Sequence, residues 1–168
     1  MERGDRVFPH PVVIVTDASW ITSRNSVDGW KSATSFSSDY WEPCEVLPYK
    51  QENVEPEIRQ LMVDTDVKPV WHPSIKSRTG DVFFRRVFYL EAEPEEAKLE
   101  VVCGGRTNVY LNDRWVGETE EWPKITSFKV RKFLIRGKNL VAVQTFREPR
   151  AIAPPALFLA LNIQTKFK

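Results

Sequence analysis

In Tyr110-Leu111-Asn112-Asp113-Arg114-Trp115-Val116-Gly117, a polar pair separates two apolar and aromatic segments. Asn and Asp are the residues other than glycine that best tolerate positive φ, so Asn112-Asp113 indicates a tight turn between two antiparallel strands. Farther along, Gly137-Lys138-Asn139 precedes the apolar run Leu140-Val141-Ala142-Val143, which is again typical of a turn followed by a strand. These stretches predict an all-β protein. They supply no chemistry, because hairpin construction explains each of their residues.

Strand patterns recur at short intervals on both sides of this hairpin. Turn residues such as Glu93-Pro94, Gly104-Gly105 and Pro154-Pro155 separate them, and this spacing is typical of an antiparallel β-sandwich. The last strand alternates cleanly, with Leu157, Leu159, Leu161 and Ile163 on one face. We expect the core strands to lie within 81–165, at 82–90, 98–103, 108–111, 115–118, 125–130, 140–146 and 157–165, after an earlier strand at 12–15.

The first part of the chain is less regular. Residues 1–73 are expected to form an N-terminal arm and a loop-rich segment that pack on the sandwich, with Trp20, Trp30 and Trp41 as anchors. Between 43 and 73, only Glu55–Met62 has a helical pattern, with a proline near its start, and we expect the remainder to be loop. The sequence therefore predicts one β-sandwich domain over 1–168 with at most one short helix.

Composition excludes several classes of partner. The chain has 168 residues, long enough to bury roughly 70% of its unfolded surface. Its 24 Lys+Arg and 23 Asp+Glu give a formal charge of +1, so electrostatics favour neither nucleic acid nor an anionic membrane as the main partner. No apolar run reaches the ~18–20 residues of a membrane span, and Met1–His10 is charged rather than signal-like. We expect a soluble chain, and the sequence leaves its compartment open.

The two cysteines, Cys44 and Cys103, fit no metal-binding spacing, so a disulfide and free thiols both stay open. Alternation in Leu99–Cys103 places Cys103 on the same face as Leu99 and Val101, toward a core. The pattern favours two buried free thiols.

Several motifs occur in an order that resembles a known family. They are Phe84-Arg85-Arg86-Val87-Phe88, Ala97-Lys98-Leu99, the Tyr110–Gly117 hairpin and Gly137–Val143. The family is the galactose-binding-like jelly roll, as in the sugar-binding domain of family-two glycoside hydrolases and the N-terminal accessory domain of bacterial α-L-rhamnosidases. Thr16–Trp20 and Phe36–Trp41 resemble the arm that precedes that sandwich, and Val70-Trp71-His72-Pro73 resembles the segment that leads into its first core strand.

The resemblance implies a jelly roll that serves as a binding or accessory module, and such modules commonly lack catalysis. Two departures matter. Asn112-Asp113 stands where the family usually has Asn-Gly, and segment 43–69 does not align. If that segment covers the loop edge where jelly rolls bind sugars, the family's site is blocked or rebuilt.

Catalytic and metal-binding patterns are weak. His10 and His72 each neighbour proline and stand far from other ligands, so neither zinc nor a Ser-His-Asp triad is supported. Glu95-Glu96 and Glu120-Glu121 lie in hydrophilic turns, where solvated charge is the simpler interpretation. Gly104-Gly105-Arg106 lacks the pattern of a phosphate loop and indicates a β-turn. We expect no enzyme activity, no cofactor and no assigned metal site, although Asp17, Asp28 and Asp39 leave a structural calcium open.

Aromatic residues are the stronger candidates for binding, because a pyranose stacks its apolar face on an indole or phenol ring. Trp71 and Trp122 neighbour proline in predicted loops, and we expect them to be exposed platforms. Further polar contacts would come from Arg85, Asn108, Tyr110 and Arg147 if their strand face opens toward the loop edge. In the alternative interpretation, Arg85 and Arg86 straddle the sheet and pair with acidic neighbours.

Three functional hypotheses follow. The first is a non-catalytic carbohydrate-binding module that binds a neutral glycan through loop aromatics. The second is a structural subunit that uses the jelly roll for contacts in a larger protein assembly. The third is an accessory domain of a glycoside hydrolase. None of them involves nucleic acid or membrane insertion.

Overall fold

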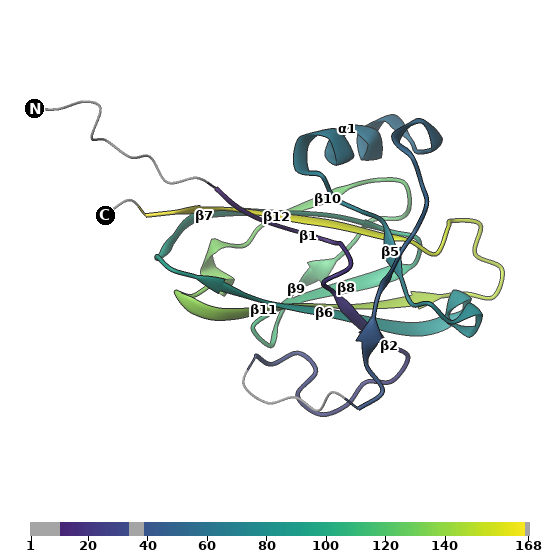
Figure 1. The fold of residues 1–168 in the computed structure, drawn as a ribbon, viewed down its shortest axis with the longest axis horizontal. Helices are drawn as coiled ribbons and strands as arrows, with labels where there is room; N and C mark the ends of the chain where they lie inside the picture. The colour runs from purple at the N-terminus through teal and green to yellow at the C-terminus, as the bar shows by residue number, and fades with distance from the viewer. Residues whose placement is uncertain (1–10, 34–38, 167–168) are drawn as a thin grey trace, which may run out of the picture.

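Two antiparallel sheets face each other in the computed structural model, which describes residues 11–33 and 39–166 (Figure 1). Predictions that fall on Met1–His10 and on residues 34–38 lie outside these ranges. Sheet A has the order β10-β7-β12-β5-β4, with β1 also paired to β12. Its strands are β1 (Val12–Val15), β4 (Glu45–Val46), β5 (Val70–Trp71), β7 (Pro94–Cys103), β10 (Thr126–Lys129) and β12 (Leu157–Thr165).

Sheet B has the order β3-β2-β6-β11-β8-β9. Its strands are β2 (Ile21–Ser23), β3 (Glu42–Pro43), β6 (Gly80–Leu90), β8 (Arg106–Leu111), β9 (Arg114–Glu118) and β11 (Gly137–Arg147). The predicted antiparallel β-sandwich is confirmed, and each strand expected between 81 and 165 is present, the last one with the predicted ends and the others with shifted ends. The one α-helix in the described residues, α1 (Pro56–Thr65), includes the predicted helical turn. No helix of the described part is long and apolar enough to cross a membrane.

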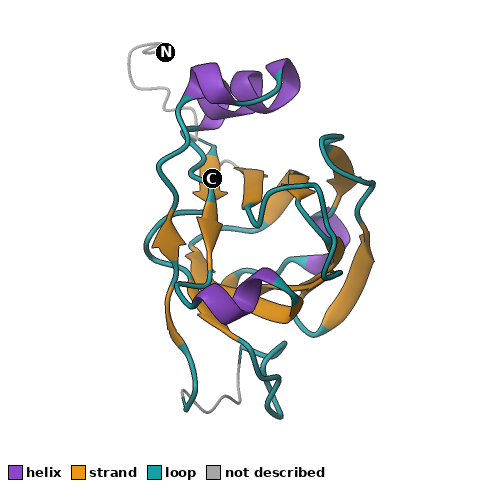
Figure 2. Ribbon diagram, turned by 90° about the vertical axis from the view of Figure 1, so that its right-hand side faces the viewer, coloured by secondary structure: helices purple, strands orange, loops and turns teal. Residues whose placement is uncertain are grey.

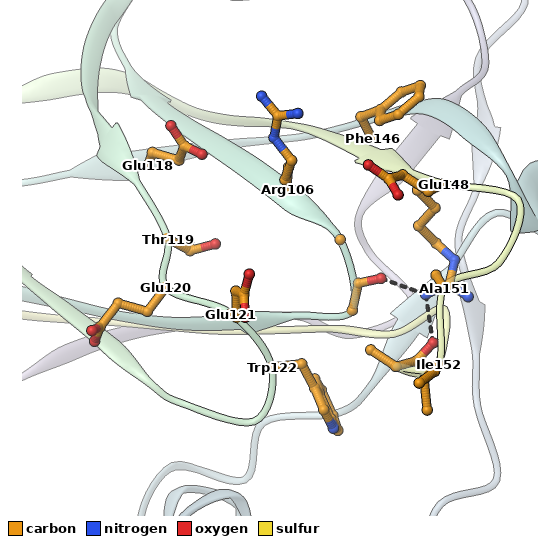
Figure 3. A pocket seen from close by; sticks show the side chains of 14 residues that line it. Arg106, Glu118, Thr119, Glu120, Glu121, Trp122, Phe146, Glu148, Ala151 and Ile152 are labelled. Carbon is orange, nitrogen blue, oxygen red and sulfur yellow. Dashed lines mark hydrogen bonds between the residues drawn. The ribbon is translucent and has the colours of Figure 1, made fainter.

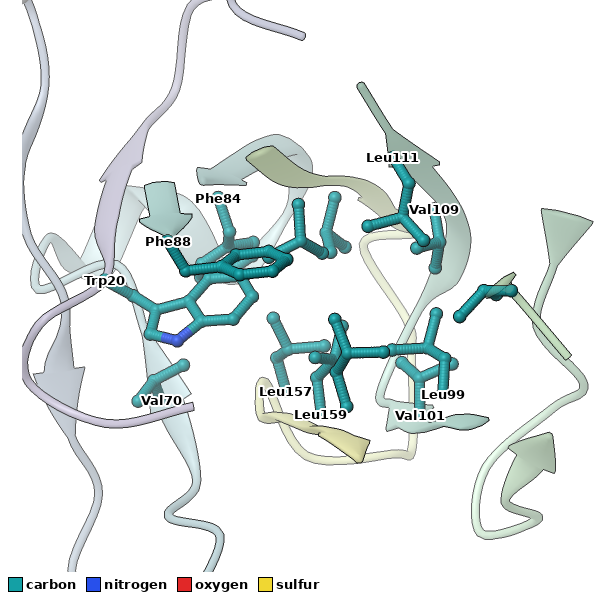
Figure 4. Packing of buried hydrophobic residues seen from close by; sticks show 14 of the residues in the cluster. Trp20, Val70, Phe84, Phe88, Leu99, Val101, Val109, Leu111, Leu157 and Leu159 are labelled. Carbon is teal, nitrogen blue, oxygen red and sulfur yellow. The ribbon is translucent and has the colours of Figure 1, made fainter. Parts of the chain in front are cut away.

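The main core lies between the two sheets (Figure 4). β6 and β11 pair along their full length, from Gly80 opposite Arg147 to Leu90 opposite Gly137. Because side chains alternate along a strand, Val141 and Val143 point into the core while Ala142 and Gln144 point outward. Trp20 is fully buried in this core, and its indole Nε1 donates a hydrogen bond of 2.8 Å to the Val15 carbonyl.

The predicted tight turn joins β8 to β9. Asn112 and Asp113 both have positive φ, 51° and 69°, as a primed hairpin turn requires. The Asn112 side chain also ties the turn to its neighbours. Its Nδ2 donates to the Phe133 carbonyl at 2.8 Å, and its Oδ1 accepts from the Leu140 amide at 2.9 Å.

Segment 43–73 is more ordered than predicted. The loop expectation is wrong at Glu45–Val46 and Val70–Trp71, which pair as β4 and β5 of sheet A. Helix α1 lies over the outer face of this sheet, where Ile58 and Leu61 pack in a cluster with strand residues Val102, Phe158 and Ala160 (Figure 1). The segment therefore covers a sheet face rather than the loop end of the sandwich.

The N-terminal arm covers part of the outer face of sheet B. Trp30 packs edge-on against Phe83 and Tyr110, with ring centroids 4.9 and 5.7 Å apart. Trp41 lies against the same cluster. The predicted anchoring role of Trp20, Trp30 and Trp41 is thus confirmed.

Cys44 and Cys103 are both buried free thiols, as the pattern favoured. Burial raises the pKa of both. Within residues 11–33 and 39–166, no group of three or more His, Cys, Asp or Glu side chains forms a metal site.

Candidate functional site

Three connections between the sheets meet at one end of the sandwich. They are the Gly104-Gly105 turn from β7 to β8, residues 119–125 between β9 and β10, and residues 148–156 between β11 and β12. Figure 2 turns this end toward the viewer. Between the connections lies a cavity of about 450 Å³, which we call the end pocket (Figure 3). Its lining is Gly104, Gly105, Arg106, Glu118, Thr119, Glu120, Glu121, Trp122, Phe146, Arg147, Glu148, Ala151, Ile152 and Ala153.

Two glycines let the connections lie directly against one another. A Cβ on Gly104 would come within 1.6 Å of the Pro154 carbonyl oxygen, and one on Gly105 within 2.6 Å of Thr145 Oγ1. The Gly104 amide instead donates to the Ala156 carbonyl at 3.0 Å. At this wall of the pocket the backbones of two connections are therefore in close contact, and a larger residue at either glycine would push them apart.

Arg147 holds this end together from inside. Only 5% of its surface is exposed, and its guanidinium donates to the carbonyls of Arg78 at 2.8 Å, Ala153 at 2.7 Å and Gly104. It also lies 6.0 Å from the ring centroid of Trp71. Burial lowers the pKa of the Arg147 guanidinium. Arg147, one of the predicted ligand contacts, lines the pocket, but its donors serve the backbone of the surrounding connections.

The pocket rim is polar and mostly acidic. Arg106 and the carboxylates of Glu118, Glu120, Glu121 and Glu148 surround the opening (Figure 3). Thr119 contributes a buried hydroxyl, Oγ1, that has no hydrogen-bond partner in the described part of the chain. A buried polar group without a partner is uncommon, and a ligand hydroxyl or water is what such a group binds. Together these groups offer acceptors, a planar donor and one unused hydroxyl.

Trp122 forms an apolar wall of the pocket. The indole is half-buried and packs on Phe158, with ring centroids 6.2 Å apart and planes inclined by 38°. The Trp122-Pro123 peptide bond is cis. Of the two tryptophans predicted to be exposed platforms, Trp122 is the one that the structure brings to a cavity.

The expected exposure of Trp71 is wrong. Only 2% of its surface is exposed, its ring packs against Phe84, and its Nε1 donates to the Ser77 carbonyl at 3.2 Å. The reason is that β5 pairs with both β4 and β12, so Trp71 lies inside sheet A rather than in a loop. The proline two residues later marks the end of a strand.

The other predicted contacts lie on the outer face of sheet B. Arg85 is buried beneath the arm, donating to the carbonyls of Trp30 and Ser32 at 3.3 Å each, and burial lowers its pKa to about 10. Tyr110 is partly covered by Trp30 and by Lys31, whose Nζ lies 4.6 Å from the ring centroid. Asn108 lies beside Gln144, outside the arm. The six predicted residues are thus divided among the core, the end pocket and this face.

Sequence reasoning missed Arg106 and Thr119 in the end pocket and Trp115 on sheet B. The first two flank connections that pass from one sheet to the other, a position that strand patterns alone do not reveal. Trp115 was assigned to the hairpin, yet 58% of its surface is exposed. A bulge in β9 sets Trp115 opposite Tyr110, on the outward side.

No protein-family model and no curated protein matches this sequence. Solved structures share its fold. A glycosyl hydrolase family 2 member from Bacteroides cellulosilyticus matches 89% of this chain with a TM-score of 0.58 and 16% identity. The β-glucuronidase of Bacteroides uniformis matches 90% with a TM-score of 0.56 and 17% identity. The α-L-rhamnosidase of Streptomyces avermitilis matches 58% with a TM-score of 0.51 and 18% identity.

This chain spans 20%, 18% and 10% of those three chains. The resemblance to the galactose-binding-like domain of glycoside hydrolases is confirmed as a likeness of fold.

Proposed function

We propose that this chain is a non-catalytic carbohydrate-binding or accessory domain that binds a neutral glycan in the end pocket. The observation that carries the proposal is one cavity with an indole wall, an acidic rim, an exposed arginine and a buried hydroxyl that has no hydrogen-bond partner among residues 11–33 and 39–166. A volume of about 450 Å³ is within the range of small-ligand pockets. The likeness of fold to glycoside hydrolase chains supports the same class of ligand.

The chemistry of the pocket suits a neutral sugar. Ring hydroxyls donate to carboxylates and accept from the Arg106 guanidinium, while the apolar face of the ring lies on Trp122. Four glutamates against Arg106 and the buried Arg147 leave the pocket net negative, which disfavours an anionic sugar.

A binding role without catalysis agrees with the surroundings of the carboxylates. A glycosidase needs two carboxyl groups in different environments, one of them with a raised pKa to act as an acid. Glu118, Glu120, Glu121 and Glu148 are all exposed to solvent at the rim. The short span of this chain relative to the glycoside hydrolase chains also supports a module rather than a whole enzyme.

A contact with another protein domain is the second candidate. Ile152 is fully exposed on the β11–β12 connection, at the rim of the end pocket. Phe146, which is also exposed, lines the same pocket, and together the two side chains give this end of the sandwich apolar surface against which a partner domain can pack. Such a contact is also what an accessory domain of a glycoside hydrolase would make.

A glycan array probed with the purified chain tests the proposal. We expect selective binding to neutral glycans that is lost in Arg106→Ala and Trp122→Ala. Tyr89→Ala is the matched control, because Tyr89 is 67% exposed and lies nine positions along β6 from the pocket end, a distance of about 30 Å. Because Trp122 also packs on Phe158, a thermal melt of Trp122→Ala must show that the variant is still folded. Arg106 is exposed, so Arg106→Ala tests binding with less effect on stability. An array without any bound glycan, or equal binding by all variants, would contradict the proposal.

A further inference from the structure

Part of the outer face of sheet B is left uncovered by the N-terminal arm, and it carries a chain of hydrogen-bonded side chains. Trp115 Nε1 donates to Asn108 Oδ1 at 3.0 Å, Asn108 Nδ2 donates to Gln144 Oε1 at 3.2 Å, and Gln144 Nε2 donates to Asp81 Oδ1 at 2.8 Å. We call these four residues the amide row. They fix one another's orientation before any ligand arrives.

The amide row crosses four of the six strands of sheet B. Its members come from β9, β8, β11 and β6, which are consecutive neighbours in sheet B. Adjacent strands lie about 4.8 Å apart, so the row is on the order of 14 Å long. This is longer than a single sugar ring. A ligand that used the whole row would have to be a chain of several rings.

Hydrogen-bonding capacity remains along the row. Asn108 Nδ2 and Gln144 Nε2 each carry two hydrogens, and in the described part of the chain each uses one. Trp115 uses its only polar atom inside the row while much of its ring stays exposed. Planar amides beside an exposed indole provide the combination that sugars use, hydroxyl contacts next to an apolar platform.

The row adjoins the end pocket. A shallow depression of about 240 Å³ contains Asn108 and Gln144, and three of its lining residues, Arg106, Glu118 and Phe146, line the end pocket as well. A ligand seated in the pocket would therefore pass Arg106, Glu118 and Phe146 to reach the row.

We infer that the ligand is an extended neutral oligosaccharide, one end of which occupies the end pocket while its chain lies across the amide row. This inference rests on the proposed function, and it adds the length and direction of the ligand. It requires two separable contributions to the binding affinity. The end pocket sets the affinity for a short sugar, and the amide row adds affinity only when the chain is long enough to reach Trp115.

Titration calorimetry with a series of neutral oligosaccharides, from monosaccharide to hexasaccharide, tests the inference. The series is chosen among cello-, manno- and galacto-oligosaccharides by the array result. We expect affinity to rise about tenfold or more with chain length. Trp115→Ala and Asn108→Ala should remove this gain and leave the affinity for the shortest bound sugar unchanged. Both side chains lie at the surface, and Tyr89→Ala serves as the control.

The outcomes separate the two claims. Affinity independent of chain length, or a length dependence that Trp115→Ala leaves intact, would overturn the inference and leave the proposed function standing. Absence of binding to any saccharide of the series would overturn both. Both claims would also be overturned if the chain bound no saccharide and instead bound another protein through the row, with that binding lost in Trp115→Ala.

Discussion

At the scale of single residues, two arginines of the end pocket have different tasks. Arg147 is buried and donates to three backbone carbonyls, whereas Arg106 is exposed at the rim. Arg147→Met leaves those carbonyls without their donor, so we expect the free energy of unfolding to fall by about 2–4 kcal/mol. Arg106→Ala should change it by less than about 0.5 kcal/mol. Urea unfolding of both variants measures the difference, and equal stability of the two would contradict the structural role of Arg147.

His72 predicts a dependence of stability on pH. Burial is the main cause that lowers its pKa below the ordinary 6.5, Glu42 opposes the shift, and Arg24 adds to it. The unfolded chain therefore binds a proton at higher pH than the folded chain does. Stability should be lost as pH falls below about 6.5, until the folded-state pKa is passed.

The comparison is between the wild type and His72→Asn, by urea unfolding at about pH 7.5 and pH 5.5. The effect on stability of carboxylates that both proteins share then cancels in the comparison. The wild type should lose more stability than the variant over this interval. An equal loss in both would show that His72 does not contribute.

For single residues, the sequence predicted breaks in regular structure better than it predicted burial. Proline beside Trp71 and Trp122 indicated a break in regular structure in both cases. It did not indicate that β5, the strand of Trp71, lies between β4 and β12, or that Trp122 borders a cavity. Burial depends on which strands pair at a distance, and a local pattern does not contain that information.

At the scale of elements, the β8–β9 turn allows a matched pair of glycine substitutions. Asn112 and Asp113 both have positive φ, a conformation that glycine adopts at lower cost. The Asp113 side chain is exposed, so Asp113→Gly should stabilise the protein by about 0.5–1 kcal/mol. Asn112→Gly should destabilise it, because the bonds to Phe133, Asn139 and Leu140 are lost. Thermal melts check the opposite signs, and destabilisation by both changes would contradict this account.

Long strands were predictable and very short ones were not. β6, β7, β11 and β12 are nine to eleven residues long and contain apolar and β-branched runs, which are enough to indicate a strand. β3, β4 and β5 have two residues each, too few to show any period. They form because a neighbouring strand offers them hydrogen bonds: β3 pairs with β2, β5 with β12, and β4 with β5.

At the scale of the whole molecule, the formal charge of +1 conceals a local excess of acid at the end pocket. We therefore predict discrimination by ligand charge. A neutral glycan that binds should bind more tightly than its uronic acid counterpart, and the difference should shrink with added salt because these carboxylates are exposed. Titration calorimetry at low and high ionic strength measures it. Tighter binding of the anionic sugar would contradict the prediction.

The end pocket itself could not be predicted from local patterns. Its walls come from turns that are far apart in the chain, around Gly104, Glu120 and Ala153. Only the packing of the two sheets against each other brings these turns together. The sequence indicated each turn separately, and it treated Glu120-Glu121 as solvated charge. The resemblance to jelly rolls supplied the expectation of a site at a loop edge. Such a site is possible because three connections between the sheets meet at one end of the sandwich.

The central claim is that the end pocket is a glycan-binding site, and the most direct test maps a bound glycan onto the backbone. For a chain of 19.5 kDa, amide chemical shifts can be followed by NMR during titration with the glycan chosen from the array. We predict that the shifts concentrate at Gly104, Gly105, Thr119 and Glu120 and leave Tyr89 unchanged. Shifts confined to other surfaces, with these amides unmoved at saturation, would contradict the account.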